Sequence, residues 1–118
     1  MSVTYLSDVE AKENHGILIY ELLTEHNSDA KRTGLALAEV KPGAKMTAHK
    51  HRITEEQYYF LSGKGVMRLD EEEFSVYRGA AVNIPPGKVH VLENTGNENL
   101  VFVVISSPHY DPTDEKHV

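Results

Sequence analysis

The feature that most constrains the fold of this chain is the alternation of short apolar stretches with residues that favour turns. The stretches are rich in β-branched and aromatic residues, and none keeps an apolar stripe of helical period beyond a couple of turns, so they predict strands. We expect about nine strands, at residues 17–23, 35–40, 45–51, 57–61, 66–69, 74–77, 80–84, 89–92 and 100–105. The fold class is therefore all-β, a sandwich or a barrel.

Turn chemistry separates the expected strands. The gaps are short and rich in Gly, Pro, Asn and Asp, which predicts hairpins, as at Pro42-Gly43, Gly63 to Gly65, Pro85 to Gly87 and residues 94–97. Residues 28–33 predict a longer surface loop, and residues 108–118 a polar, acidic tail with little capacity to form a core. With 118 residues the chain is long enough for a single domain, which we place at residues 1–118.

Composition excludes several classes of function. The chain has no cysteine, which removes disulfides, thiol nucleophiles and thiolate metal sites, so any metal must be held by nitrogen and oxygen ligands. Eighteen acidic residues against twelve basic ones give a net charge of −6, and the basic residues are scattered, so nucleic acid is not an expected partner. No apolar run is long enough to cross a bilayer and residues 1–10 lack the features of a signal peptide, so we expect a cytoplasmic protein without a membrane partner.

A set of histidines and one glutamate predicts a metal site. His49 and His51 stand two residues apart, and on a strand such residues share a face, so both imidazoles would point the same way. Glu56 follows at the start of the next apolar run and could add a carboxylate from a neighbouring strand, and His90 comes just after a rigid Pro-Pro-Gly turn. Glu55 competes with Glu56, because a shift of one residue in register exchanges the two faces of a strand. Three neutral imidazoles and a carboxylate suit Fe, Mn, Ni, Cu, Co or Zn.

The spacing of these residues resembles a known family. The first motif reads Gly43, five residues, His49, one residue, His51, four residues, Glu56, six residues, Gly63. The second reads Gly79, five residues, Pro85, one residue, Gly87, two residues, His90, three residues, Asn94. Both motifs, at residues 43–63 and 79–94 and separated by fifteen residues, are similar to those of the cupin superfamily, and of small single-domain prokaryotic cupins in particular.

This resemblance implies a double-stranded β-helix, or jelly-roll barrel, in which His49, His51, Glu56 and His90 converge on one divalent transition metal. It implies less about the reaction, because cupins include dioxygenases, decarboxylases, isomerases, lyases and proteins without known activity. Many relatives carry two prolines where this chain has Pro108-His109. His109 could add an imidazole near the mouth of the barrel, but we do not assign it as a ligand.

Our leading hypothesis is a metal-dependent enzyme that acts on a small oxygenated metabolite, with Glu56 and Tyr58 as candidate catalytic residues. No other His, Asp or Glu can be placed in the pocket from the sequence as a proton-transfer group, which narrowly favours dioxygenase chemistry over isomerase, lyase or decarboxylase chemistry. The alternative is a non-catalytic module that binds a metal or a small ligand. Tyr58 and Phe60 share the parity of Glu56 and would point inward, whereas Tyr59 and Leu61 would form an apolar outer face, which favours a homodimer.

Overall fold

The computed structural model describes residues 3–108 and 111–118. These residues form strands almost throughout, with two short 3-10 helices, η1 (Leu6–Asp8) and η2 (Pro112–Asp114). The strands are β1 (Lys12–Asn14), β2 (Ile17–Leu23), β3 (Gly34–Val40), β4 (His49–His51), β5 (Glu55–Ser62), β6 (Lys64–Leu69), β7 (Glu72–Tyr77), β8 (Ala81–Ile84), β9 (His90–Asn94), β10 (Leu100–Ser107) and β11 (Glu115–His117). None of the described helices is long and apolar enough to cross a membrane.

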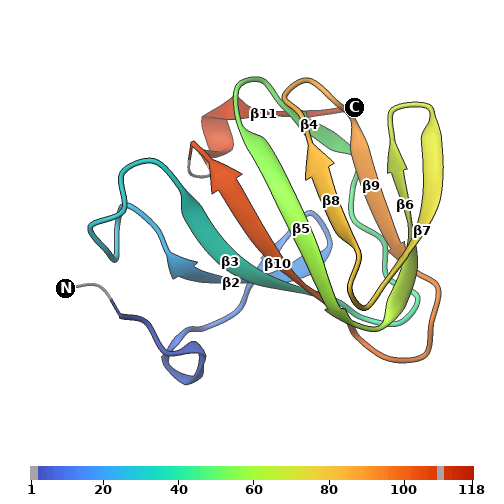
Figure 1. Cartoon of the computed structure of the whole chain (residues 1–118), viewed down its shortest axis with the longest axis horizontal. Coiled ribbons are helices and arrows are strands. Elements are labelled where there is room, and N and C mark those ends of the chain that lie inside the picture. Colours follow the sequence, from blue (N-terminus) through green and yellow to red (C-terminus); the bar gives the residue numbers. More distant parts are fainter. Residues whose placement is uncertain (1–2, 109–110) are drawn as a thin grey trace.

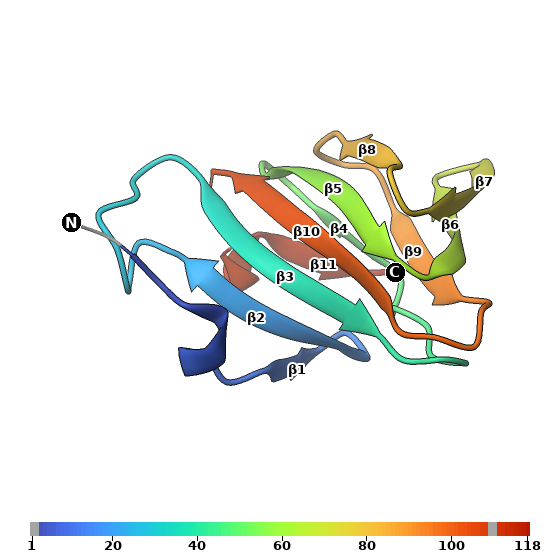
Figure 2. The same cartoon turned by 60° about the horizontal axis from the view of Figure 1, so that its bottom comes forward.

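The strands form two antiparallel sheets. The six-stranded sheet has the order β1-β2-β3-β10-β5-β8, and the five-stranded sheet has the order β11-β4-β9-β6-β7. Figure 2 looks onto the first sheet, where β2, β3, β10 and β5 run side by side, and Figure 1 shows the second sheet beyond β5 and β8. The all-β prediction is confirmed, and the architecture is a jelly roll whose two sheets face each other without closing into a continuous hydrogen-bonded ring among the described strands.

The alternation of apolar and polar residues decides which face of each strand is buried. Along β5, Glu56, Tyr58 and Phe60 are buried and the residues between them are exposed. Tyr59 and Leu61 therefore point outward, as the parity of the sequence predicts. The inward row of β5 lies against the inward row of β10, because Phe60 pairs with Phe102 and their rings lie 5.1 Å apart.

The core lies between the two sheets. Its fully buried side chains are apolar and come from both sheets, including Phe60, Phe102, Met67, Leu92 and Val76. Met67 on β6 is among the residues with an exposed fraction of 0%. Burying a large apolar side chain stabilises the folded state by about 1.5–3 kcal/mol, so this layer fixes the separation of the sheets and, with it, the position of the polar residues at one end.

The strand predicted at residues 45–51 is shorter than expected, because regular pairing begins only at His49. Residues 45–47 contact two different neighbours instead of one strand. The backbone N–H of Met46 donates to the carbonyl of Leu92 at 2.7 Å, and that of Thr47 donates to the carbonyl of His15 at 2.9 Å. A segment that divides its hydrogen bonds in this way cannot extend one ladder, which confines β4 to His49–His51.

Residues 111–118 of the expected polar tail include a strand, β11, and a buried carboxylate. β11 pairs with β4, with Lys116 opposite Lys50. Asp114 is buried, and its carboxylate accepts hydrogen bonds from the backbone N–H groups of Ile53 at 3.0 Å and Thr54 at 2.9 Å. The buried carboxylate thus ties the tail to the loop that follows β4. His109, the uncertain position of the sequence analysis, lies outside the described residues.

Candidate metal centre

Three histidines predicted as ligands meet at one end of the five-stranded sheet. His49 and His51 lie on β4 and His90 lies on β9, where it pairs directly with His49. Each offers a ring nitrogen, and these atoms all lie within 4.8 Å of one another. The three side chains are buried, with exposed fractions of 4, 3 and 0%. The parity of β4 therefore directs both of its imidazoles to one side, as the sequence predicts.

Glu56 reaches the same place from the other sheet. Its Oε1 lies 3.3 Å from Nε2 of His51 and 3.5 Å from Nε2 of His90, and its Oε2 accepts a hydrogen bond from Ser106 at 3.4 Å. Glu55, the competing carboxylate, is exposed and accepts a hydrogen bond from Asn83 at 3.0 Å. The structure thus brings the carboxylate of Glu56, and not that of Glu55, to the three imidazoles.

Backbone carbonyls orient two of the rings. Nδ1 of His49 donates to the carbonyl of Thr47 at 2.8 Å, and Nδ1 of His90 donates to the carbonyl of Lys88 at 3.2 Å. Each hydrogen bond fixes a tautomer that leaves Nε2 with a free lone pair. Within the described part of the chain, Nε2 of His90 and Oε1 of Glu56 are buried and have no hydrogen-bond partner. Buried polar atoms of this kind are costly unless something satisfies them, and a divalent cation fits this donor set.

The charge states in the site also suit a cation. Burial, with the nearby His90 as a second cause, lowers the pKa of His49 to about 3, so this ring is neutral near neutral pH. Burial opposes the charge of Glu56, but the nearby rings of His51 and His90 outweigh it and lower the pKa of Glu56 to about 2. For His51, burial is outweighed by the nearby carboxylate of Glu56, and its pKa is raised. A cation bound at this carboxylate would compete with protonation of His51.

The cluster opens into a cavity of about 330 Å³. His49, His51 and Glu56 lie in its lining, together with Tyr58. Tyr58 is buried, and its ring packs 4.7 Å from that of Phe102. Burial raises the pKa of the Tyr58 hydroxyl well above its ordinary value, with the Glu56 charge as a further cause, so the hydroxyl keeps its proton. Tyr58 is placed to donate a hydrogen bond and not to act as a base.

The sequence analysis missed two residues beside the cluster, His15, which lines the cavity, and Glu115. His15 lies in the turn between β1 and β2, with a positive φ of 56° that is followed by Gly16 at 82°. Its Nε2 contacts the carboxylate of Glu115 on β11, and its ring stacks on that of His49 with centroids 4.1 Å apart and planes inclined by 10°. The Asn-His-Gly sequence signals a turn but not its position over the site, because that position depends on pairing between distant strands.

Stacking separates the role of His15 from that of His49. Lone pairs of imidazole nitrogens lie in the plane of the ring, so two stacked, nearly parallel rings hold them in separate planes that do not meet at one point nearby. His15, His49 and Glu115 form a second group of possible ligand atoms within 4.8 Å, but the stack favours His15 as the partner of Glu115 beside the first cluster. The sequence did not allow a further His, Asp or Glu to be placed in the pocket, and the structure places His15 in its lining.

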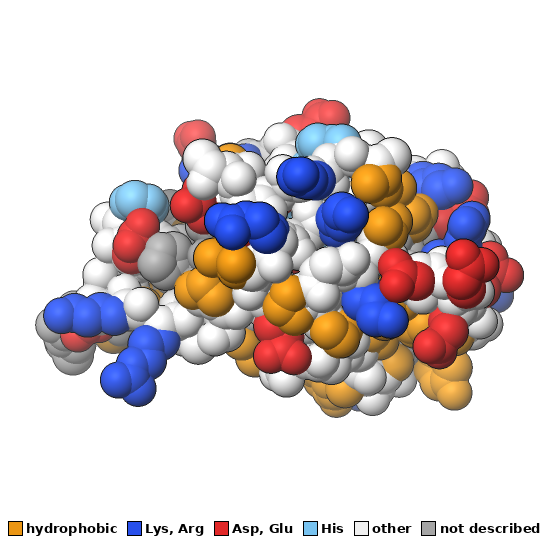
Figure 3. Space-filling model, turned by 90° about the horizontal axis from the view of Figure 1, so that it is seen from above, with side chains coloured by type: hydrophobic (Ala, Val, Ile, Leu, Met, Phe, Trp, Pro, Cys, Tyr) orange, Lys and Arg blue, Asp and Glu red, His pale blue; other side chains and the backbone are white. Residues whose placement is uncertain are grey.

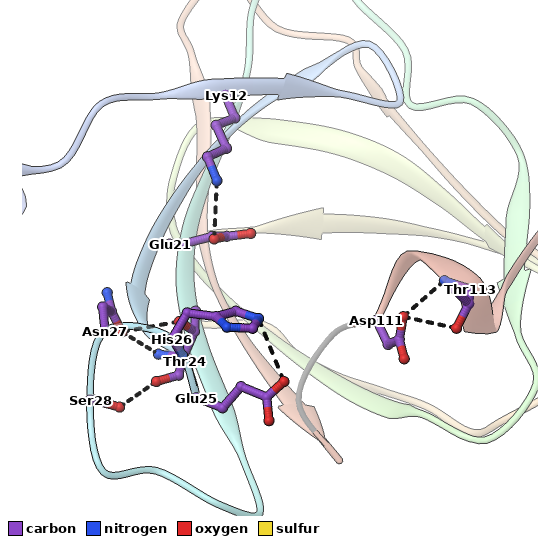
Figure 4. A network of polar contacts seen from close by, with 9 residues as sticks. All are labelled: Lys12, Glu21, Thr24, Glu25, His26, Asn27, Ser28, Asp111 and Thr113. Carbon is purple, nitrogen blue, oxygen red and sulfur yellow. Dashed lines mark hydrogen bonds and ion pairs between the residues drawn. The ribbon is translucent and has the colours of Figure 1, made fainter.

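The rim of the cavity is polar. Lys12, Glu21, Thr24 and His26 contribute to its lining, and Figure 4 shows Lys12 reaching Glu21 and His26 turned toward Glu25. The Lys12 ammonium lies 3.4 Å from the Glu21 carboxylate. On the face of the molecule seen in Figure 3, basic and acidic side chains are interspersed with hydrophobic ones. Charge of one sign therefore does not dominate that face.

The fold and the site together define a class of protein, a small jelly-roll protein with a buried His-rich cluster at one end of a cavity. Residues 36–106 match the Cupin domain family, and the chain belongs to this family.

Individual relatives agree with this assignment. An uncharacterised protein of Methanocaldococcus jannaschii, MJ1618, is 41% identical over 99 residues, which cover 84% of this chain and 79% of that protein. The tetracenomycin polyketide synthase protein TcmJ of Streptomyces glaucescens is 30% identical over 103 residues, covering 87% of this chain and 69% of its own. The crystal structure of a predicted oxalate decarboxylase from Thermotoga maritima superposes with a TM-score of 0.80 at 25% identity, covering 90% of this chain and 98% of the other.

Proposed function

We propose that this protein is an enzyme that binds one divalent transition metal through His49, His51, His90 and Glu56 and acts on a small oxygenated molecule. The observation that supports the proposal is the convergence of the three imidazoles and the Glu56 carboxylate, with buried ligand atoms of His90 and Glu56 that lack hydrogen-bond partners among the described residues. When bound, such a metal would act as a Lewis acid or, if it is Fe, Mn, Cu, Co or Ni, would also provide redox chemistry.

The protein groups around the cluster have distinct roles in this proposal. Glu56 and Tyr58 are the candidate catalytic residues: Glu56 holds the cation and can accept a proton if it dissociates, and the protonated hydroxyl of Tyr58 donates a hydrogen bond to the substrate. The apolar walls exclude water from the bound molecule. Ser106 supports the carboxylate of Glu56 from the neighbouring strand.

Two classes of reaction suit this arrangement. Oxidative cleavage of a chelated substrate by dioxygen remains our first choice, as it requires little proton transfer from the protein. Isomerase, lyase or decarboxylase chemistry is the second, and the specific observation that favours it is the His15 and Glu115 pair beside the cluster, which the sequence analysis did not foresee. Consumption of dioxygen during turnover separates the two.

The experiment that tests the proposal has two stages. Protein purified without nickel resin is analysed for metal, and then stripped and reloaded with each candidate ion. Each form is assayed with diketones, catechols, keto acids and sugars in an oxygen electrode, with product analysis. We expect about one metal per chain, loss of both metal and turnover in His51→Ala, and retention of both in the control Glu55→Gln, whose side chain is exposed and bonded to Asn83 outside the cavity lining. Turnover by a metal-free His51→Ala protein would refute the assignment.

The alternative function is non-catalytic binding of a metal or a small ligand in the same cavity. It would be favoured if the loaded protein retained a tightly bound compound that is recovered unchanged and if none of the panel were converted. The position of the cluster at the end of a cavity, and not on the surface, is what favours the enzyme. Location in the cytoplasm remains a prediction from the sequence.

We also propose a homodimer that forms through the outer face of the six-stranded sheet. Tyr59, Leu61 and Ile105 are exposed there by 49, 41 and 40%, and Tyr59 pairs with Val103 on the adjacent strand. Exposed apolar side chains that gather on one sheet face favour contact with a second copy. Light scattering should give twice the mass of the 118-residue chain, and Tyr59→Lys should lower it to the mass of a monomer. A monomer in the unmodified protein would remove this proposal.

A further inference from the structure

The residues that line the cavity next to the cluster indicate which kind of substrate fits it. Its lining is apolar on one side, where β2 contributes Ile17 and Ile19, β3 contributes Ala36, and β10 contributes Phe102 and Val104. From this lining and its charges we infer that the site takes a molecule with an oxygen-chelating head and an apolar body, neutral or singly charged, and not a small dicarboxylate. This inference rests on the proposed function, since the head requires a metal at the cluster.

The register of the strands places the apolar wall directly beside the ligands. Ser106, which donates to Glu56, lies two residues along β10 from Val104. Val104 in turn pairs with Ala36 on β3 and with Tyr58 on β5. Residues two apart on a strand share a face, so the apolar wall begins at Val104, next to the serine that contacts the Glu56 carboxylate. A ligand held by its head at the cluster therefore meets apolar side chains as soon as it extends beyond it.

The size of the cavity supports an extended ligand. A volume of about 330 Å³ lies at the lower end of the range of pockets that bind organic ligands and is far larger than a small dicarboxylate requires. Ala36 has the smallest side chain on the wall and is only partly buried, so it leaves space that a larger residue would fill. An apolar body would displace water from this space and gain affinity by doing so.

The charges near the cluster disfavour a dianion. The carboxylate of Glu56 lies in the cluster and that of Glu115 lies against His15 beside it. Among the described residues that line the cavity, the only Lys or Arg is Lys12, whose side chain is 69% exposed at the rim and already lies 3.4 Å from Glu21. A divalent cation and the Glu56 carboxylate together leave one net positive charge in the cluster, so a dianion would bury an excess negative charge, which is costly. The names of some relatives refer to oxalate, and this cavity does not favour that anion.

The test measures binding and does not depend on turnover. Protein loaded with Co²⁺ is titrated with acetylacetone, its longer-chain alkyl homologues, benzoylacetone and oxalate, with the heat of binding and the visible absorption of Co²⁺ as readouts. We expect the affinity to rise by about fourfold for each methylene that becomes buried. Benzoylacetone should bind more tightly than acetylacetone, and oxalate should bind more weakly than either. Metal-free protein should bind none of them with comparable affinity.

A pair of variants locates the apolar body. Ala36→Leu narrows the wall and should weaken binding of benzoylacetone roughly tenfold or more, while acetylacetone changes by less than about twofold. The matched control is Ala81→Leu, the same substitution at an exposed position of β8. It should leave both affinities unchanged. Metal content and thermal unfolding of both variants establish that the cluster and the fold are intact.

The outcomes separate this inference from the proposed function. If Co²⁺ does not bind, or if acetylacetone binds without perturbing the Co²⁺ absorption, the proposed function fails. If acetylacetone binds at the metal but affinity does not rise with chain length, or if oxalate binds most tightly, the inference fails while the proposed function stands. An equal effect of Ala36→Leu on both diketones would also overturn the placement of the apolar body against β3.

Discussion

The burial of His49 predicts that acidification destabilises the metal-free protein. The folded chain keeps this ring neutral down to a pKa of about 3, whereas in the unfolded chain the ring binds a proton near pH 6.5. Below pH 6.5 the unfolded state therefore holds a proton on His49 that the folded state does not. The free energy of unfolding must fall as the pH falls through this range, until the folded state also takes up the proton near pH 3.

The magnitude follows from the size of the pH interval. Each pH unit within that interval costs about 1.4 kcal/mol for one such group. At pH 5, the contribution of His49 should be a loss of about 2 kcal/mol relative to pH 7. His51 acts in the opposite direction, because its raised pKa adds stability at low pH that is lost as the pH rises through its folded-state value. The prediction therefore concerns the difference between two proteins and not the unmodified protein alone.

The assay is urea unfolding of metal-free protein at pH 7 and pH 5, compared with His49→Gln. The glutamine variant lacks the titrating ring, so its stability should fall by about 2 kcal/mol less than that of the unmodified protein over this interval. His26→Gln is the control. Because the His26 side chain is 84% exposed, this variant should lose as much stability between pH 7 and pH 5 as the unmodified protein. An equal loss of stability in the unmodified protein and in His49→Gln would refute the reasoning.

Three further predictions follow from the fold. Asp114→Ala leaves two backbone N–H groups without their acceptor and should lower the free energy of unfolding by about 1–3 kcal/mol, as measured by urea unfolding. Gly63→Ala should destabilise more than Gly43→Ala in the same assay, because both have positive φ but only at Gly63 would a Cβ lie 2.5 Å from the carbonyl oxygen of Asn99. If the two variants lost similar amounts of stability, the clash of a Cβ at residue 63 with Asn99 would be excluded as a cause. A metal at one hundred times its dissociation constant should stabilise the protein by about 2.7 kcal/mol in thermal unfolding, and an equal shift in His51→Ala would place the ion elsewhere.

The parts of the site that lie on regular strands could be predicted from the sequence. The two-residue spacing of His49 and His51 fixes their common face, and the alternation along β5 places Glu56 and Tyr58 inside and Tyr59 outside. Strand parity is a local property of the backbone, so it can be predicted without knowing which strands become neighbours. The resemblance to the cupins then supplied the neighbours.

The parts that depend on distant segments could not be predicted. His15 stands in a turn near the start of the chain and Glu115 in a segment near its end, yet both lie beside His49 because β11 pairs with β4 and the β1-β2 turn contacts Thr47. Nothing local in an acidic segment such as 111–118 distinguishes a strand from a solvated tail. Its order comes from Asp114, whose buried carboxylate finds its partners about sixty residues away.

The join between β4 and β9 has a mechanical consequence. These two strands share a single registered pair, His49 with His90, whereas the next join in the same sheet, between β6 and β9, extends over five pairs. A metal ion bound by both His49 and His90 would hold β4 and β9 together at the place where these strands share only one registered pair. Amide hydrogen exchange should therefore slow along residues 46–51 on loading with metal, and change little in the hairpin of β6 and β7.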